Sequence, residues 1–145
     1  MKKKFFVLVV IGIVLLVTVG CNIDSLFTNV NLNNVNNKVK SSLSSYYSKN
    51  GIYLYQDDTD EMYLFLNAYN VMHGEKATYY TDIGIEVNDK TIIINFSEKR
   101  SDDYQNKEIE SNRLIYKIKK PKNVESISIL KNGQEVPFNS IIAGE

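Results

Sequence analysis

The chain of 145 residues contains one cysteine, Cys21, and one histidine, His73. Nucleophilic catalysis usually needs a base beside a serine or a cysteine, and zinc favours several histidine or cysteine ligands. No serine stands in a G-x-S-x-G motif. His73 precedes Gly74 in a polar segment, which is typical of a solvated turn. These residue types argue against a nucleophilic enzyme and against a histidine-based zinc site.

Four acidic residues lie close together in the first half of the chain, at Asp57, Asp58, Asp60 and Glu61. Calcium takes several oxygen ligands, often from aspartates at alternate positions, and Asp58 and Asp60 have that spacing. The glycine and the later glutamate of an EF-hand loop are missing. A solvated turn between two strands explains the group as well, so calcium binding remains an alternative.

A second acidic group consists of Asp102 and Asp103. Carboxylates have the chemistry for acid–base catalysis when a second carboxylate stands opposite them. This group lies in a charged segment without an aromatic platform for a substrate nearby, so an exposed loop is the simpler interpretation. An enzyme with a carboxylate pair, drawn from Asp58, Asp60, Asp102 and Asp103, is a third hypothesis.

The chain is rich in tyrosine, with ten residues. Tyrosine favours interfaces because it joins a large apolar ring to a polar hydroxyl. Alternation along a strand places Tyr53 and Tyr55 on one face. Together with Tyr79 and Tyr80 they form a possible binding face, and ordinary strand packing is the alternative.

The first twenty residues have the layout of a secretory signal. Three lysines stand at positions 2–4, and an apolar run follows at 5–19, broken only by Gly12 and Thr18. Gly20 and Cys21 end the run, and the chain turns polar at Asn22. The basic start is expected to stay on the cytoplasmic side of the membrane.

The segment Thr18-Val19-Gly20-Cys21 resembles the lipobox of bacterial lipoproteins, with Thr18 where that family usually has leucine. The resemblance implies a lipid on the thiol of Cys21, cleavage between Gly20 and Cys21, and an anchor on the extracytoplasmic face of the cell membrane. Two alternatives are an uncleaved transmembrane anchor and an ordinary secretory signal. The apolar run is short for the former, since a spanning helix needs about 20 residues.

The remaining chain, 21–145, has 125 residues and fits one domain with a tether. Its 14 basic and 17 acidic residues give a net charge of −3. A nucleic-acid binder needs a clustered basic face, which is missing here. Cys21 is the only cysteine, so the domain has no internal disulfide and depends on its apolar core.

Residues 21–50 are rich in asparagine and serine, which predicts a polar tether after the lipidated cysteine. A weak helical stripe within this tether is the alternative, so its order stays open. The stripe comprises Leu26, Val30, Val35, Val39 and Leu43.

Residues 51–145 predict an all-β domain, a small antiparallel sandwich or partly open barrel of about seven strands. Turn-forming pairs at Asn88-Asp89 and Asn132-Gly133 predict two tight hairpins. We expect an exposed loop at 98–112 and a loose tail at 140–145. The expected strands are 52–55, 62–69, 79–87, 90–96, 113–119, 124–131 and 134–138.

The strand course from Tyr63 to Phe138 resembles the C-terminal domain of PrcB-type proteins, protease-complex subunits of bacterial envelopes. The shared features are Tyr79-Tyr80 leading into 83–87, an apolar strand at 92–94 followed by Glu98, and the segment 116–121. Thr78-Tyr79-Tyr80 stands where the family has Gly-Gly-Tyr. The resemblance implies an all-β accessory subunit that positions a partner protease and has no catalytic residues of its own.

The leading hypothesis is therefore a lipid-anchored, non-enzymatic binding or accessory protein of the bacterial cell envelope. It needs no cofactor, and its expected partners are the membrane, through Cys21, and an envelope protein such as a protease. A small-ligand or calcium-binding lipoprotein is the alternative.

Overall fold

The computed structural model of the protein describes residues 26–144. The predicted signal peptide at 1–20 and the predicted lipid site at Cys21 lie outside the described residues. Within residues 26–144, no helix is both long and apolar enough to cross a membrane.

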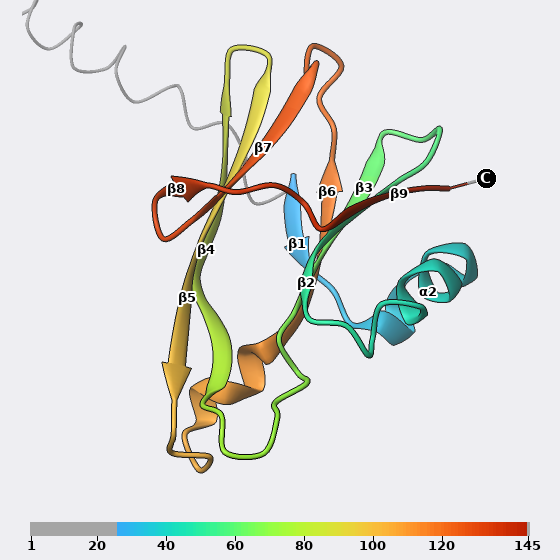
Figure 1. Cartoon of the computed structure of the whole chain (residues 1–145). Helices are drawn as coiled ribbons and strands as arrows, with labels where there is room; N and C mark the ends of the chain where they lie inside the picture. Colours follow the sequence, from blue (N-terminus) through green and yellow to red (C-terminus); the bar gives the residue numbers. More distant parts are fainter. Residues whose placement is uncertain (1–25, 145) are drawn as a thin grey trace, which may run out of the picture.

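The described chain forms nine strands in two facing sheets, neither of which closes into a barrel (Figure 1). The all-β sandwich predicted from the sequence is confirmed. The larger sheet has the order β1 (Phe27–Asn29), β6 (Arg113–Lys119), β3 (Glu61–Asn67), β2 (Gly51–Gln56) and β9 (Ser140–Ala143). The smaller has the order β4 (Ala77–Asn88), β5 (Thr91–Ser101), β7 (Ser126–Lys131) and β8 (Gln134–Glu135).

The main core lies between the two sheets and follows from the alternation of apolar residues along the strands. Alternate residues of β3, Leu64 and Leu66, face alternate residues of β5, Ile92 and Ile94, and all four are fully buried. Ile129 of β7 is also fully buried there, and Ile127 packs partly buried against the same core.

Both predicted hairpins are present. At the β7–β8 turn, Asn132 and Gly133 have φ of 52° and 78°, and at the β4–β5 turn Asp89 has φ of 51°. These left-handed conformations suit asparagine, aspartate and glycine, and they match the twist of the two strands.

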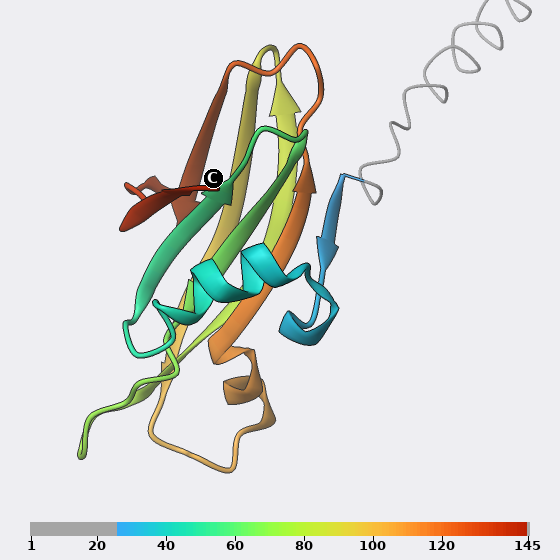
Figure 2. The same cartoon turned by 90° about the vertical axis from the view of Figure 1, so that its right-hand side faces the viewer.

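A second core lies on the other face of the larger sheet, beneath helix α2 (Asn37–Ser44). Figure 2 shows α2 lying across the strands of this sheet. The helix begins at Asn36, whose side chain accepts a hydrogen bond from the Val39 N–H at 2.9 Å. Val39 and Leu43 are fully buried against aromatic side chains of β2 and β3.

The predicted domain boundary at residue 51 is therefore wrong for residues 26–50. The helical alternative for this segment is confirmed in part: Val39 and Leu43 lie in α2, which follows the short helix η2 (Leu32–Asn34), whereas Leu26 and Val30 flank strand β1. Strand β1 pairs antiparallel with β6, and its Phe27 ring stacks on Tyr116 at 4.3 Å between ring centroids. Apolar residues spaced through the polar segment bury enough surface to fold it onto the sheet.

Two other expectations need correction. The tail expected to be loose from residue 140 is ordered over residues 140–143, because β9 pairs with β2 at the edge of the larger sheet. The segment at 98–112 is not one long loop, because β5 reaches Ser101 and the helical segment η3 (Lys107–Asn112) covers the start of β4. The predicted strand at 62–69 is confirmed, with bounds Glu61–Asn67 and a central place in its sheet.

The expectation of a wholly antiparallel sheet is wrong for two strand pairs, β5–β7 and β2–β9. Between β5 and β7 the chain crosses to the other sheet, forms β6 there and returns. It therefore re-enters the smaller sheet in the direction of β5, which makes the pair parallel. The sequence pattern does not show that the chain crosses between the sheets, because a strand has the same alternation of side chains whether it pairs parallel or antiparallel.

We predict that Leu43→Ala destabilises the whole domain, because α2 is a layer of the fold rather than part of a tether. Loss of a fully buried leucine should lower the free energy of unfolding by about 2–5 kcal/mol, measured by urea denaturation. Lys40→Ala, at an exposed position of the same helix, should change it by less than about 0.5 kcal/mol. Equal small effects would show that α2 is not packed on the sheet.

Candidate functional site

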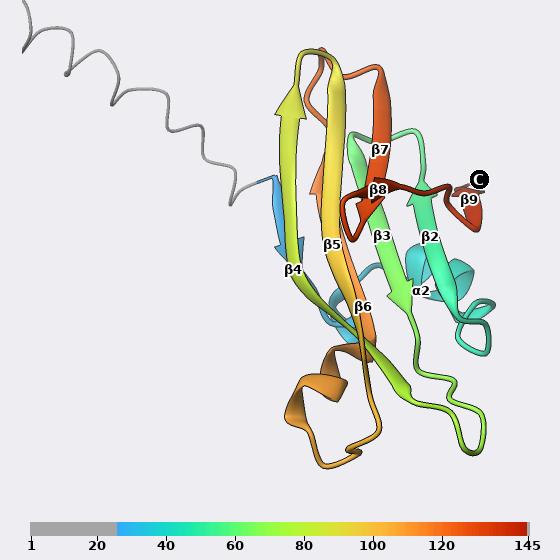
Figure 3. The same cartoon turned by 60° about the vertical axis from the view of Figure 1, so that its left-hand side comes forward.

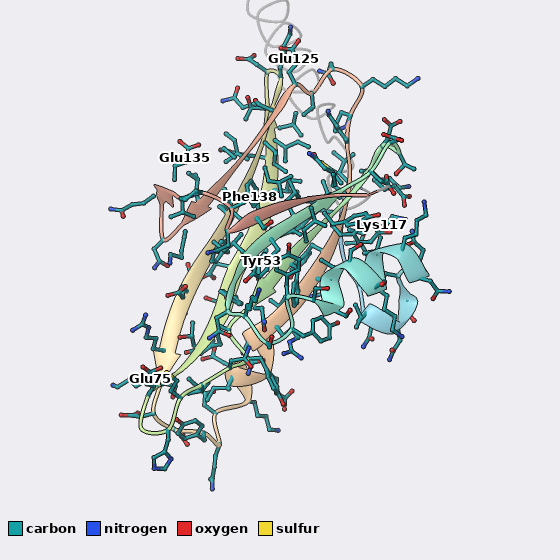
Figure 4. All side chains as sticks on the ribbon, turned by 45° about the vertical axis from the view of Figure 1, so that its right-hand side comes forward. Tyr53, Glu75, Lys117, Glu125, Glu135 and Phe138 are labelled. Carbon is teal, nitrogen blue, oxygen red and sulfur yellow. The ribbon has the colours of Figure 1, made fainter. Side chains whose placement is uncertain are left out.

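The elongated sandwich has two ends that differ in character (Figure 3). One end, here called the N-terminal end, consists of the β2–β3 turn, the β4–β5 turn and the segment 120–125. Leu26 lies near this end, because its carbonyl accepts a hydrogen bond from Lys119 N at 2.9 Å. The opposite end, here called the loop end, consists of the loop 68–76, the loop 102–106, η3 and the start of β2. Figure 4 shows Glu125 and Glu75 at these two opposite ends.

The loop end is held together by Asn67, the last residue of β3 and a fully buried amide. Its Nδ2 donates to three carbonyls of the α2–β2 connection, those of Tyr46, Tyr47 and Lys49, at 3.2, 3.1 and 2.8 Å. Its Oδ1 accepts from the Tyr69 N–H and from Arg113 Nε, both at 3.2 Å. One side chain therefore joins α2, β3 and β6.

Arg113 extends this network to the surface. Its guanidinium donates to the Tyr47 carbonyl at 3.0 Å and lies between two aromatic rings. The distances from Cζ to the ring centroids are 4.6 Å for Tyr47 and 4.1 Å for Tyr69, within the range of a cation–π contact. The Tyr69 ring is held in this stack although the residue is 57% exposed.

A cleft of about 540 Å³ opens at the loop end, between the ends of β2 and β3 on one side and those of β4, β5 and β7 on the other. Glu98 lies in it with side-chain oxygens 3.3 Å from Lys131 Nζ and 3.8 Å from an Arg100 nitrogen. Tyr80 also lines the cleft, and no hydrogen bond of its hydroxyl is present within residues 26–144. Burial and the nearby Glu98 carboxylate raise the pKa of Tyr80, so the hydroxyl stays neutral and can donate.

A second hollow, of about 550 Å³, adjoins the cleft and shares Glu75 and Lys76 with it. Met72 and Tyr104 line this hollow and are 71% and 61% exposed. The Tyr104 hydroxyl donates to the Glu75 carbonyl, and Lys76 forms an ion pair with Asp102 at 3.5 Å. The two loops of this end are thus connected to each other.

The four tyrosines predicted as a binding face, Tyr53, Tyr55, Tyr79 and Tyr80, are all buried, at 0 to 6% exposure. That prediction is wrong. Tyr53 and Tyr55 do share one face, but α2 covers it. Tyr80 belongs to the core between the sheets, and η3 covers Tyr79, whose hydroxyl donates to Glu108 at 3.0 Å.

The exposed aromatic residues of the loop end are Tyr69 and Tyr104, neither of which was predicted from the sequence as part of a binding face. Alternation favours residues inside strands, whereas these two lie just after β3 and in the loop after β5. Their position beyond the strand ends was the signal in the sequence that they are exposed, because loops are not covered by another layer of the fold.

The two acidic groups lie at opposite ends, so the structure does not bring Asp58 and Asp60 together with Asp102 and Asp103. All four residues are exposed.

Asp57 closes the β2–β3 turn by accepting from Thr59 N and Oγ1, and these hydrogen bonds lower the pKa of Asp57. Among the described residues, no three histidine, cysteine or acidic side chains are placed to hold a metal ion. His73 is exposed in the loop 68–76.

No family model, curated protein or solved structure matches the chain. The lipobox and PrcB-type resemblances of the sequence therefore stay predictions.

We predict that Asn67→Leu lowers the free energy of unfolding by about 1–3 kcal/mol, because it removes the partner of buried backbone groups and of Arg113. Asn123→Leu, in an exposed segment, should have little effect. Urea denaturation followed by tyrosine fluorescence would measure both variants. A cost for Asn67→Leu no greater than that of the control would show that the network is not needed.

Proposed function

We propose that the protein is a lipid-anchored, extracytoplasmic binding or accessory protein of the bacterial cell envelope, without enzymatic activity, and that its loop end contacts a protein partner. The anchor is the lipid on Cys21, after cleavage that follows Gly20. The lipobox-like segment supports the anchor, and the surface of the loop end supports the binding role.

The observation that carries the binding role is the clustering of exposed apolar side chains. Within residues 26–144, five large apolar residues are exposed, and three of them, Tyr69, Met72 and Tyr104, belong to the loop end. Tyrosine, methionine and arginine are enriched where proteins bind each other. The second hollow gives Met72 and Tyr104 a concave surface rather than a flat one.

The charges of the loop end favour a protein over an anionic surface. Basic and acidic side chains alternate around the two hollows and pair with each other, as Lys76 does with Asp102 and Lys131 with Glu98. Anionic lipid surfaces and nucleic acids require a cluster of basic residues. An envelope protease is one candidate partner, on the strength of the PrcB-type resemblance alone.

A small polar ligand in the cleft is the second candidate function. The Tyr80 hydroxyl favours it, because Tyr80 lines the cleft and its hydroxyl makes no hydrogen bond within the described residues. A neutral hydroxyl at this position can donate to a ligand that enters the cleft. Calcium has no comparable support in the described part of the chain.

Cys21→Ser tests the anchor. We expect the full-length variant to lose incorporation of labelled palmitate and to leave no acylated form in a mass spectrum, because serine cannot form the thioether. The wild-type chain should gain the mass of its acyl chains and stay in the membrane fraction after a carbonate wash. Acylation of the serine variant, or an unmodified Cys21 in the wild-type protein, would contradict the anchor.

Crosslinking on intact cells, followed by mass spectrometry of the captured species, tests the binding role. If the loop end binds a protein, Met72→Asp combined with Tyr104→Ser should reduce the reproducible crosslinked partner about tenfold or more, because both remove exposed contact side chains.

Ile141→Asp is the matched control for the crosslinking, since Ile141 is an exposed apolar residue, at 54%, on the edge strand β9 away from the loop end. It should leave the crosslink unchanged. Equal loss in both variants, or no partner for the wild-type protein, would contradict protein binding by the loop end.

A further inference from the structure

The inner face of the smaller sheet changes from apolar to charged at the loop end. Residues of β5 point alternately to the two faces of the sheet, and those that point inward are Ile92, Ile94, Phe96, Glu98 and Arg100. The first three lie in the main core, whereas Glu98 and Arg100 line the cleft. Lys131 of β7, which stands opposite Phe96, lines it as well. Charged side chains therefore replace apolar ones where the space between the sheets opens into the cleft.

The fold itself does not need charges at these positions. The side chains of Glu98 and Lys131 are only 20% and 34% exposed, so both lose part of their hydration. Apolar residues of similar volume would fill the end of a sandwich without this cost. Partly buried charged groups that break the apolar pattern inside a cleft are candidates for a binding site.

Three hydrogen-bond donors of the cleft have no acceptor within residues 26–144. They are the Tyr80 hydroxyl, Asn139 Nδ2 and the Arg100 guanidinium, whose distance of 3.8 Å to Glu98 is too long for a hydrogen bond. In this part of the chain, the Tyr55 hydroxyl is the only buried side-chain polar atom without a partner. The Tyr80 hydroxyl is therefore open to the cleft, and the cleft offers donors to a ligand that brings acceptors.

The strand register brings two of these donors together. Tyr80 of β4 stands opposite Glu98 of β5, and Thr78 stands opposite Arg100. Tyr80 and Arg100 are therefore diagonal neighbours on one face, about 7–8 Å apart, a separation that long and aromatic side chains reach across. A guanidinium presents a planar pair of donors that suits a carboxylate. The hydroxyl and the guanidinium can thus donate to one carboxylate group.

The charge of the cleft also favours a carboxylate. Three basic and two acidic side chains line it, which leaves a net charge of +1, and they are Lys76, Arg100, Lys131, Glu75 and Glu98. A carboxylate carries one negative charge and balances this excess. A phosphate monoester carries about −1.5 to −2 charges, so it would exceed the excess and be repelled by Glu98.

We propose that the cleft binds the free carboxylate at the C-terminus of a peptide. The Arg100 guanidinium and the Tyr80 hydroxyl donate to the carboxylate, and Asn139 Nδ2 is a further donor for the backbone beside it. Because the loop end is proposed to bind a protein, the peptide is the terminal segment of that partner, and the assignment rests on that proposed function.

The walls of the cleft favour a chain end over an internal acidic residue. Its inner wall is the main core, through Ile52, Ala68 and Tyr80, so a peptide that enters from the loop end finishes there. Ile52 and Ala68 offer an apolar contact to the last side chain. The preceding residues lie toward the second hollow, which shares Glu75 with the cleft and exposes Met72 (Figure 4).

Fluorescence anisotropy of labelled peptides, with the full-length protein in detergent micelles, tests the site. The probe is a mixture of pentapeptides with an N-terminal fluorophore, randomised central residues and alanine, valine or leucine at the C-terminus. The same mixture with an amidated C-terminus is the control probe, because the amide lacks the negative charge. We expect the free acid to bind about tenfold or more tightly than the amide, since charge-assisted hydrogen bonds are the stronger ones.

Two variants locate the binding. Arg100→Gln removes the guanidinium and should abolish the difference between acid and amide. Tyr80→Phe keeps the core ring but removes the hydroxyl, so it should weaken binding of the acid several-fold and leave the amide unchanged, which a merely structural effect would not do. Lys99→Gln makes the same charge change at an exposed position on the opposite face of β5, and should leave both affinities unchanged.

Equal affinity for acid and amide, no binding of either at millimolar concentration, or a difference that persists in both variants would overturn the carboxylate site. Propionate, added as a competitor at the concentration of the peptide, distinguishes a free small acid from a peptide end. Competition as strong as that of the unlabelled peptide would overturn the peptide as occupant. The crosslinking with Met72→Asp and Tyr104→Ser reports separately, so loss of the carboxylate site would leave the protein-binding role standing.

Discussion

The structure of the loop end depends on the buried amide of Asn67. Three carbonyls that follow α2 would each lose one of their hydrogen-bond donors if this side chain were absent, and Arg113 would lose an acceptor. Buried polar groups cost free energy unless they are paired, so the amide determines where the chain leaves the helix and enters β2. The Tyr47–Arg113–Tyr69 stack is built on that position. A buried side chain therefore positions part of the exposed surface that is proposed to bind a partner.

The apolar strands explain why the segment before residue 51 is folded. Residues 52–55 of β2 and 62–66 of β3 are buried on both faces, and a sheet with one solvated face would alternate instead. A second layer had to cover the Tyr53 and Phe65 side, and α2 with Val39 and Leu43 provides it. The apolar pattern of these strands indicates that a second layer is needed. The residues that provide this layer are spaced widely among asparagines and serines, so the helical pattern of their segment is weak.

The sequence predicts local structure here better than the relation between distant segments. The hairpin at Asn132-Gly133 was predictable because left-handed turn residues stood between alternating arms. The β1–β6 and β2–β9 pairs were not, since three- and four-residue edge strands carry little pattern, and β9 pairs across more than eighty residues of sequence. The tyrosine assignment failed for the same reason. Alternation shows that Tyr53 and Tyr55 share a face, but not that a helix covers it.

The exposed aromatic side chains of the loop end are ordered before any partner arrives. Tyr69 is stacked on Arg113, and Tyr104 is joined through its hydroxyl to the Glu75 carbonyl of the neighbouring loop. Side chains already held in place lose less conformational entropy on binding, so more of their contact free energy becomes affinity. Met72, exposed in the same loop as Glu75, has an unbranched side chain that adapts to the shape of the opposing surface. Two fixed rings together with one adaptable side chain favour recognition of a particular protein surface over nonspecific apolar contact.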